Sequence, residues 1–131
     1  MTNIFEYQNY RSYLRDYYEE QKRTSKRFSY RYFSEKAGIN ASAFLYYVIE
    51  SKRNLTKNSI LKISRAIGHG KQESEYFENL VFFNQADSIA EKTHYYNQLI
   101  DTRKHIDIKR VGKNQMEYYA AWYHSVIREV L

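Results

Sequence analysis

Apolar residues recur about every three or four positions along most of the chain, which is the spacing of one face of an α-helix. One such stripe, made of Tyr10, Tyr13, Leu14, Tyr17 and Tyr18, predicts a first helix over about residues 5–22. Proline is absent, and glycine occurs only at positions 38, 68, 70 and 112. Because these two residue types are the strongest breakers of regular structure, we expect an all-α fold with long helices.

Two short helices are expected in the next segment, because residues suited to helix ends bound them. Ser29 can accept hydrogen bonds from the free N–H groups that begin a second helix, and Gly38 suits the left-handed position that ends it. Asn40 is the expected cap of a third helix over about residues 41–51.

A fourth helix is expected between Thr56, which can cap its start, and Gly68, which can end it. Its predicted buried side consists of Ile60, Leu61, Ile63, Ala66 and Ile67. A strongly amphipathic fifth helix follows and carries Tyr76, Phe77, Leu80, Val81 and Phe83.

The C-terminal part predicts further helices and one extended segment. A sixth helix covers about residues 87–104, after which Ile106, Ile108 and Val111 alternate with polar residues and predict a short extended segment. A last helix has an apolar face of Met116, Tyr119, Ala120, Tyr123, Val126, Ile127 and Val130. No residue suited to end this helix precedes Leu131, so we expect either a longer protein or packing on a partner chain.

Composition fits a globular chain in a reducing compartment. Of the 131 residues, 43% are hydrophobic and 27% are charged, which is enough apolar surface for one core. The absence of cysteine excludes a disulfide framework, a zinc finger and thiol catalysis. Neither a signal peptide nor a long apolar run is visible, so we expect a cytoplasmic protein without a membrane partner.

Positive charge is concentrated in the first half of the chain. Residues 1–70 contain 13 Lys and Arg against 6 Asp and Glu, a net charge of +7, whereas residues 71–131 contain 8 against 9, a net charge of −1. This asymmetry favours a polyanionic partner for the first half. The alternative is a basic surface that serves only solubility.

The segment "AGIN", between the second and third helices, satisfies the mechanics of a helix-turn-helix. Ala37 allows the two helices to approach closely, Gly38 permits the sharp turn, and Ile39 anchors the turn in the core. The shared core should contain Phe33, Phe44, Leu45 and Val48. A plain helical hairpin within a bundle is the alternative interpretation.

If this motif binds DNA, the exposed side of the third helix faces the major groove. That side should carry Ala41, Ser42, Ala43, Tyr46 and Tyr47. A tyrosine ring can lie on a thymine methyl group, but Arg and Gln, the usual readers of base edges, are absent here. We therefore expect weak direct readout, by Asn40, Ser42 and Tyr46.

A basic cluster follows the third helix. The residues expected to contact phosphates, and to supply affinity more than specificity, are Lys52, Arg53, Asn54, Lys57 and Asn58. Arg27 and Arg31, near the start of the second helix, could extend the same surface. For the lysines and arginines of the cluster, an ordinary solvated surface is the alternative.

Residues 28–68, "FSYRYFSEKAGINASAFLYYVIESKRNLTKNSILKISRAIG", resemble the Cro/CI-type (lambda repressor-like, XRE-type) helix-turn-helix domains of bacterial regulators. Four segments along nearly the whole chain, "FEYQNYRSYLRDYYEE", "SKRNLT", "EYFENLVFFNQA" and "YYAAWYHSVIREVL", more closely resemble the uncharacterised Fibrobacter/Bdellovibrio-type major paralogous family of predicted transcriptional regulators.

This resemblance implies a lambda repressor-like helix-turn-helix bundle followed by long C-terminal helices. It places the DNA-binding domain in residues 1–70, and a helical arm in residues 71–131 that begins a longer C-terminal domain of unknown function. The family often has a glycine at the position of Ser51, so we expect the turn before Lys52 to be built differently in this chain.

Catalysis is not expected. His69, His94, His105 and His124 lie on different predicted elements, without metal-binding spacing and without paired carboxylates. Neither a phosphate-binding glycine loop nor a nucleophile elbow is present. We therefore expect no cofactor, no metal and no small-molecule site in this stretch.

Double-stranded DNA and a second copy of the chain are the expected partners. The aromatic residues of the last predicted helices more often pack or form a subunit interface than bind a ligand. A homodimer through these helices would present two recognition helices to a palindromic site. The alternative function is a protein-interaction module that uses the basic half and the aromatic arm; RNA binding is disfavoured because no sheet platform is visible.

Overall fold

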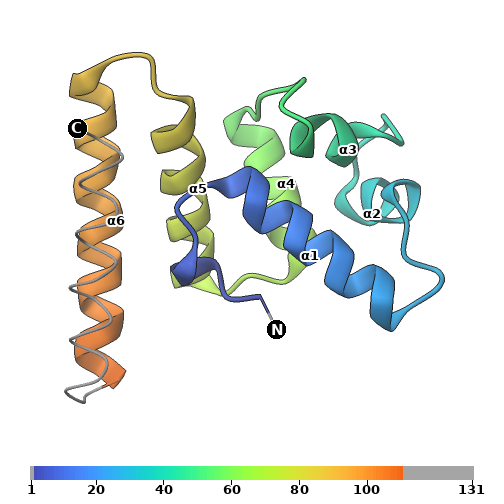
Figure 1. Ribbon diagram of the computed structural model, residues 1–131, viewed down its shortest axis with the longest axis horizontal. Coiled ribbons are helices and arrows are strands. Elements are labelled where there is room, and N and C mark those ends of the chain that lie inside the picture. Colours follow the sequence, from blue (N-terminus) through green and yellow to red (C-terminus); the bar gives the residue numbers. More distant parts are fainter. Residues whose placement is uncertain (1, 111–131) are drawn as a thin grey trace.

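The computed structural model describes the backbone of residues 2–110 and the side chains of residues 2–106, and the regular secondary structure of this part of the chain is entirely helical. The elements are η1 (Ile4–Glu6), α1 (Tyr10–Thr24), α2 (Tyr30–Ala37), α3 (Phe44–Ile49), α4 (Lys57–Ile67), α5 (Lys71–Gln85) and α6 (Ile89–Arg110) (Figure 1). The all-α fold class is therefore confirmed. The predicted last helix lies outside the described residues.

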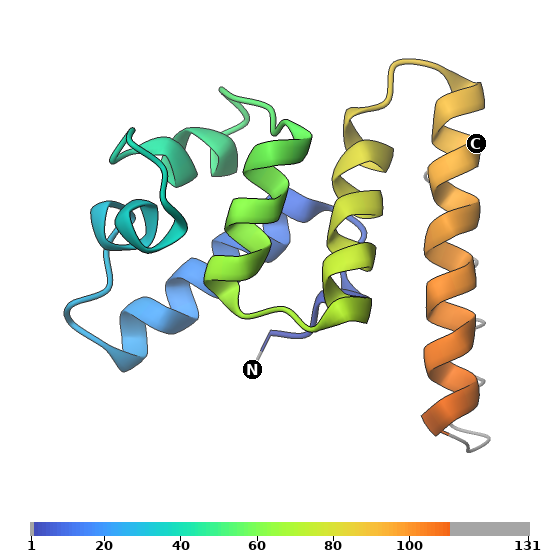
Figure 2. The same ribbon diagram turned by 180° about the vertical axis from the view of Figure 1, so that it is seen from behind.

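The helices form a bundle with α5 at its centre. Helices α1 and α4 pack on one side of α5, with α2 and α3 beyond them, and α6 runs alongside its other side (Figures 1 and 2). Arg103 of α6 is buried and donates a hydrogen bond of 2.7 Å to the carbonyl of Phe5, which ties the outer helix to the N-terminal segment. None of the described helices is long and apolar enough to cross a lipid bilayer.

Local capping interactions set most of the helix boundaries. The Ser29 hydroxyl accepts from the Tyr32 N–H at 3.0 Å, and the Thr56 hydroxyl accepts from the Ser59 N–H at 3.2 Å. Gly38 and Gly68 end α2 and α4 with φ angles of 74° and 94°, the left-handed conformation that favours glycine. These predicted helix ends are confirmed.

The third helix is shorter than predicted and has no side-chain cap. It begins at Phe44, and Ala43 rather than Asn40 precedes it. The Ser42 carbonyl accepts a hydrogen bond of 3.3 Å from the Ser34 hydroxyl of α2, so residues 40–43 form a turn that is anchored to the preceding helix. The predicted role of Asn40 as a cap was wrong for this reason.

Three other sequence predictions need correction. The segment predicted to begin the first helix forms the separate turn η1, and Asn9 caps α1 by accepting from the N–H groups of Arg11 and Ser12. Leu61, predicted to be buried, is 42% exposed.

The third correction concerns the segment after residue 105, which is helical through Arg110 rather than extended. Ile106 continues the buried face of Leu99 and Arg103, at a spacing of three to four residues, and this packing favours the helix. Val111, the last residue of the predicted extended segment, lies outside the described residues.

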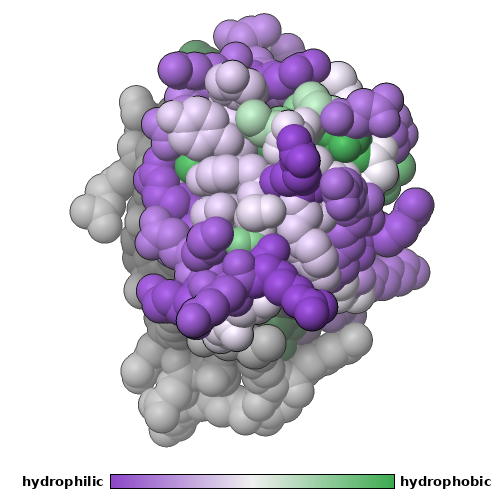
Figure 3. Space-filling model, turned by 90° about the vertical axis from the view of Figure 1, so that its right-hand side faces the viewer, coloured by the Kyte–Doolittle hydropathy of each residue, from purple (hydrophilic) through white to green (hydrophobic). Residues whose placement is uncertain are grey.

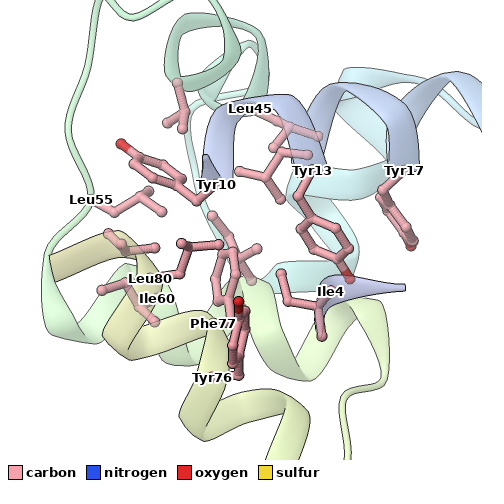
Figure 4. Packing of buried hydrophobic residues seen from close by; sticks show 14 of the residues in the cluster. Ile4, Tyr10, Tyr13, Tyr17, Leu45, Leu55, Ile60, Tyr76, Phe77 and Leu80 are labelled. Atoms are coloured by element: carbon pink, nitrogen blue, oxygen red, sulfur yellow. The ribbon is translucent and has the colours of Figure 1, made fainter. Parts of the chain in front are cut away.

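One hydrophobic cluster joins residues on both sides of position 70. Tyr10, Tyr13 and Leu45 from the first helices meet Phe77 and Leu80 of α5 (Figure 4). The side-chain amides of α5 reinforce this contact: Gln85 accepts from the Tyr10 hydroxyl at 2.7 Å and from the Leu55 N–H at 2.8 Å. Helix α5 is therefore an integral part of the core that the N-terminal helices form. That residues 71–131 together make up a C-terminal helical arm stays a prediction.

His69 links three helices through hydrogen bonds. Its Nε2 atom lies 2.7 Å from the Tyr13 hydroxyl of α1, and its Nδ1 atom lies 2.6 Å from the Ser64 hydroxyl of α4. Ser64 donates to Ser74 of α5 at 3.1 Å, so its oxygen is available to accept from Nδ1–H. In a neutral imidazole of that tautomer, Nε2 accepts from the Tyr13 hydroxyl. Burial lowers the pKa of His69 below its ordinary value of 6.5, against a smaller opposite effect of Glu73.

The lowered pKa of His69 makes stability depend on pH. The unfolded chain takes up the histidine proton near pH 6.5 and the folded chain takes it up only at lower pH, so the free energy of unfolding should fall as pH drops below about 6.5. Urea unfolding between about pH 7.5 and 5 measures this dependence. We expect His69→Gln to flatten it, whereas His94→Gln, on the exposed surface of α6, should keep it. Equal pH dependence in wild type and His69→Gln would contradict this assignment.

Candidate functional site

The surface of α2 and α3 combines exposed aromatic rings with polar groups. Tyr46 and Tyr47 of α3 are 39% and 43% exposed, while the remaining residues of α3 are buried. Tyr32 of α2 is 44% exposed. Seen from the side of α2 and α3, weakly polar surface forms a pale band between strongly hydrophilic patches (Figure 3). The predicted exposure of Tyr46 and Tyr47 is therefore confirmed.

Four tyrosines from three helices are in sequential ring contact, and we call them the tyrosine row. Tyr18 of α1 stacks on Tyr30 of α2, with ring centroids 4.0 Å apart and planes at 5°. Tyr30 meets Tyr46 edge to face at 5.5 Å, and Tyr46 meets Tyr47 at 5.6 Å. The row fixes the exposed rings of α3 against the two preceding helices. Its members are far apart in sequence, so no local pattern could have revealed it.

The inner rings of the tyrosine row, Tyr18 and Tyr30, are uncharged at neutral pH. Burial raises the pKa of Tyr30, and the nearby Tyr18 and Glu50 raise it further. Burial likewise raises the pKa of Tyr18. Both hydroxyls therefore keep their protons, and Tyr30 is neutral where it meets Tyr46.

The turn after α3 places Lys52 and Arg53 directly beside the helix end. Ser51 adopts a φ angle of 63°, its N–H donates to the Val48 carbonyl at 3.1 Å, and the Lys52 N–H donates to the Tyr47 carbonyl at 2.9 Å. Gly38 and Gly68 end their helices with the same pair of hydrogen bonds. The expectation that this turn is built differently was therefore wrong, because Ser51 takes the conformation of a glycine.

Arg11 of α1 holds this turn in place. Its guanidinium donates to the Val48 carbonyl at the end of α3, to the Arg53 carbonyl at 2.9 Å, and to the Asn54 side-chain oxygen at 2.7 Å. One side chain therefore satisfies three acceptors in the segment that carries the basic cluster. Sequence reasoning missed Arg11, because only the folded chain brings residues 48–54 next to α1.

A hollow of about 240 Å³ lies between the turn before α3 and the start of α4, and we call it the basic hollow. Two cations line this hollow. The Arg53 guanidinium lies 5.0 Å from the centre of the Phe44 ring, and the Lys62 ammonium group donates to the Gly38 carbonyl at 3.3 Å. The lining residues are Gly38, Ile39, Asn40, Phe44, Arg53, Asn54, Thr56, Asn58, Ser59 and Lys62. Two cations and several amide and hydroxyl groups suit this hollow to an anion.

The basic hollow brings together some of the predicted site residues, namely Asn40, Arg53, Asn54 and Asn58. It also includes Lys62, which sequence reasoning missed; its position one turn after Asn58 on α4 was the available signal. The other predicted site residues do not line the hollow: Arg27, Arg31, Ser42, Ala43, Tyr46, Tyr47, Lys52 and Lys57. All of these are exposed except Ala43, which is half-buried.

One acidic side chain limits the positive charge of this surface. Glu50 is exposed at the end of α3, directly before residues 51–54, which we call the basic turn.

In the described part of the chain, no group of three or more His, Cys, Asp or Glu side chains could hold a metal ion.

The described part of the protein is an all-α bundle. Its third helix exposes two tyrosines that belong to the tyrosine row, and a basic hollow lies at its first residue, Phe44. Comparison of the chain with models of known protein families, with curated proteins and with solved structures gave no match.

We expect Arg11→Gln to loosen the basic turn. Loss of the charged donor leaves backbone acceptors without their partner, which should lower the free energy of unfolding by about 2 kcal/mol. Urea unfolding measures the loss, and amide hydrogen exchange should show faster exchange at residues 51–54. Arg15→Gln, an exposed position one turn further along α1, should change stability by less than about 0.5 kcal/mol. If both variants behave alike, Arg11 does not hold the turn.

Proposed function

We propose that this protein binds double-stranded DNA with the surface formed by α3, the turn after it and the start of α4, and that it regulates transcription. The observation that carries the proposal is that α3 exposes Tyr46 and Tyr47 while positive groups flank both of its ends: the basic hollow begins at Phe44, and Lys52 follows the last turn. On this hypothesis α2 and α3 are the helix-turn-helix of a lambda repressor-like domain, and the family resemblance of the sequence supports it.

An exposed helix side suits the major groove. A groove about 12 Å wide admits an α-helix, and the phosphates on its edges attract cations that flank the inserted helix. Tyr46 and Tyr47 project from the exposed side of α3. Lys52 and Arg53 follow the C-terminal end of this helix, and Arg53 and Lys62 line the basic hollow at Phe44, its first residue. On this hypothesis these three side chains contact phosphates.

Charge supports the same partner. Residues 1–70 carry a net charge of +7, and the complementary half is nearly neutral. Each lysine or arginine that neutralises a phosphate releases counterions, so affinity should fall steeply with salt. The Glu50 carboxylate opposes this attraction, because it is exposed and directly precedes the basic turn in the chain.

A homodimer would complete the proposed function. Two copies of α3, one helical turn of DNA apart, would bind a palindromic site with twice the contact surface of one. The C-terminal helices proposed to form the dimer lie partly outside the described residues. The proposed setting is the bacterial cytoplasm, where the DNA is accessible.

The double substitution Lys52→Ala with Arg53→Ala tests the proposal. Fluorescence polarisation with a genomic DNA pool at several salt concentrations should show weaker binding and a salt slope reduced by about one or two. Lys104→Ala, on the exposed surface of α6, is the matched control and should leave both quantities unchanged. Absence of binding by wild type at low salt would refute DNA binding altogether.

Substitution of Glu50 by glutamine should act in the opposite direction. Glu50→Gln removes a negative charge next to the proposed phosphate path while keeping the length of the side chain, so DNA affinity should rise by about two- to fivefold at low salt. The gain should shrink as salt is added. Glu75→Gln, exposed on α5, is the control. Unchanged affinity for Glu50→Gln would place the end of α3 away from the DNA.

One observation favours a second candidate function. Tyr32, Tyr46 and Tyr47 expose aromatic surface of the kind that is enriched in protein interfaces. A protein-interaction module would use this surface with an acidic partner. In that case the salt slope of DNA binding would not respond to loss of Lys52 and Arg53.

A further inference from the structure

We infer that the exposed rings of Tyr46 and Tyr47 contact the C5-methyl groups of thymine in the major groove, so that the preferred DNA site contains thymine at the positions under α3. This inference rests on the proposed function and adds what the surface recognises. It begins from the side chains that α3 and its preceding turn offer to the edges of base pairs.

The chemistry of these side chains favours apolar contacts. Residues 39–51 contain no Arg, Lys or Gln, which are among the side chains that read guanine or adenine by paired hydrogen bonds. Asn40, the remaining amide, lies at the basic hollow. The side chains that α3 itself exposes are therefore the two tyrosine rings. The turn before it adds the exposed Ser42 hydroxyl and the half-buried methyl group of Ala43.

Among the four bases, thymine alone carries an apolar group on the major-groove edge, its C5-methyl. A tyrosine face offers a flat apolar surface to such a methyl. A contact that removes one methyl group from water should change affinity by about fourfold. Methyl groups on neighbouring thymines could meet the neighbouring rings of Tyr46 and Tyr47, whose centroids lie 5.6 Å apart.

The tyrosine row makes such a contact less costly. Tyr46 is held by Tyr30 at 5.5 Å, and Tyr30 is stacked on Tyr18 at 4.0 Å. An exposed ring that is already restrained loses less side-chain entropy on binding than a free one. The stack thus supports a recognition role for Tyr46 more than a role in the core, since Tyr46 remains 39% exposed.

Two experiments separate the methyl contact from other uses of these tyrosines. Duplexes bound by the wild-type chain are first selected from a random-sequence pool at low salt, and enrichment of thymine is expected. Each thymine of a selected duplex is then replaced by deoxyuridine, which removes only the methyl group. At the contacted positions affinity should fall about fourfold for each methyl.

Duplexes that carry 5-methylcytosine at a contacted position test whether the rings recognise thymine or any pyrimidine with a C5-methyl group. The shared chemistry is a C5-methyl pyrimidine, so the assignment to thymine requires that the selected duplexes place thymine under α3. A duplex with 5-methylcytosine at a contacted position should recover the affinity that deoxyuridine loses. Selection of methylated cytosine in preference to thymine from a mixed pool would overturn the assignment to thymine.

Variants of the rings supply the matched controls. Tyr46→Ala and Tyr47→Ala should abolish the difference between thymine and deoxyuridine, whereas Tyr46→Phe and Tyr47→Phe, which lose only the hydroxyl, should keep it. Tyr32→Ala removes an equally exposed tyrosine outside the row and should also keep it. Circular dichroism melting establishes that each variant is folded.

The outcomes distinguish this inference from the proposed function. Equal affinity of wild type for thymine and deoxyuridine duplexes, or selected duplexes without thymine enrichment, overturns the methyl contact and leaves DNA binding standing. Loss of discrimination in the Tyr→Phe variants assigns the hydroxyls rather than the rings and also overturns it. Absence of binding to any duplex overturns both.

Discussion

Helix α3 has only six residues, far fewer than an isolated helix needs to be stable in water. Its position depends on tertiary contacts: Leu45 and Val48 are fully buried, and Arg11 binds the carbonyl at its C-terminal end. The exposed rings, the basic turn and the basic hollow all take their places from this short helix. The proposed DNA surface therefore depends on the α1 to α3 contact.

Helix α5 stabilises the contact between α1 and α3. The Gln85 side chain of α5 accepts from the Tyr10 hydroxyl at the start of α1 and from the Leu55 N–H just after the basic turn, and so holds these two segments together. His69 adds a second link between α1, α4 and α5. Residues on both sides of position 70 thus act together to present α3.

Local rules predicted much of this fold from the sequence. Ser29 and Thr56 cap their helices, and Gly38 and Gly68 end theirs, because these interactions involve residues close in sequence. The start of α3 was mispredicted because the Ser34 hydroxyl, on another helix, binds the Ser42 carbonyl. For the candidate site, the local sequence pattern identified Arg53 and the exposed Tyr46 and Tyr47. It could not identify the role of Arg11 or the stack of Tyr18 on Tyr30, because these contacts form only in the folded chain.

The central claim, that the α3 surface binds duplex DNA, is tested most directly by nuclear magnetic resonance. Titration of the labelled chain with a selected duplex at low salt should shift the amide resonances of residues 40–54 and of the first two turns of α4. The resonances of α6 should stay in place. Shifts confined to α5 and α6, or no shifts at all, would contradict the account.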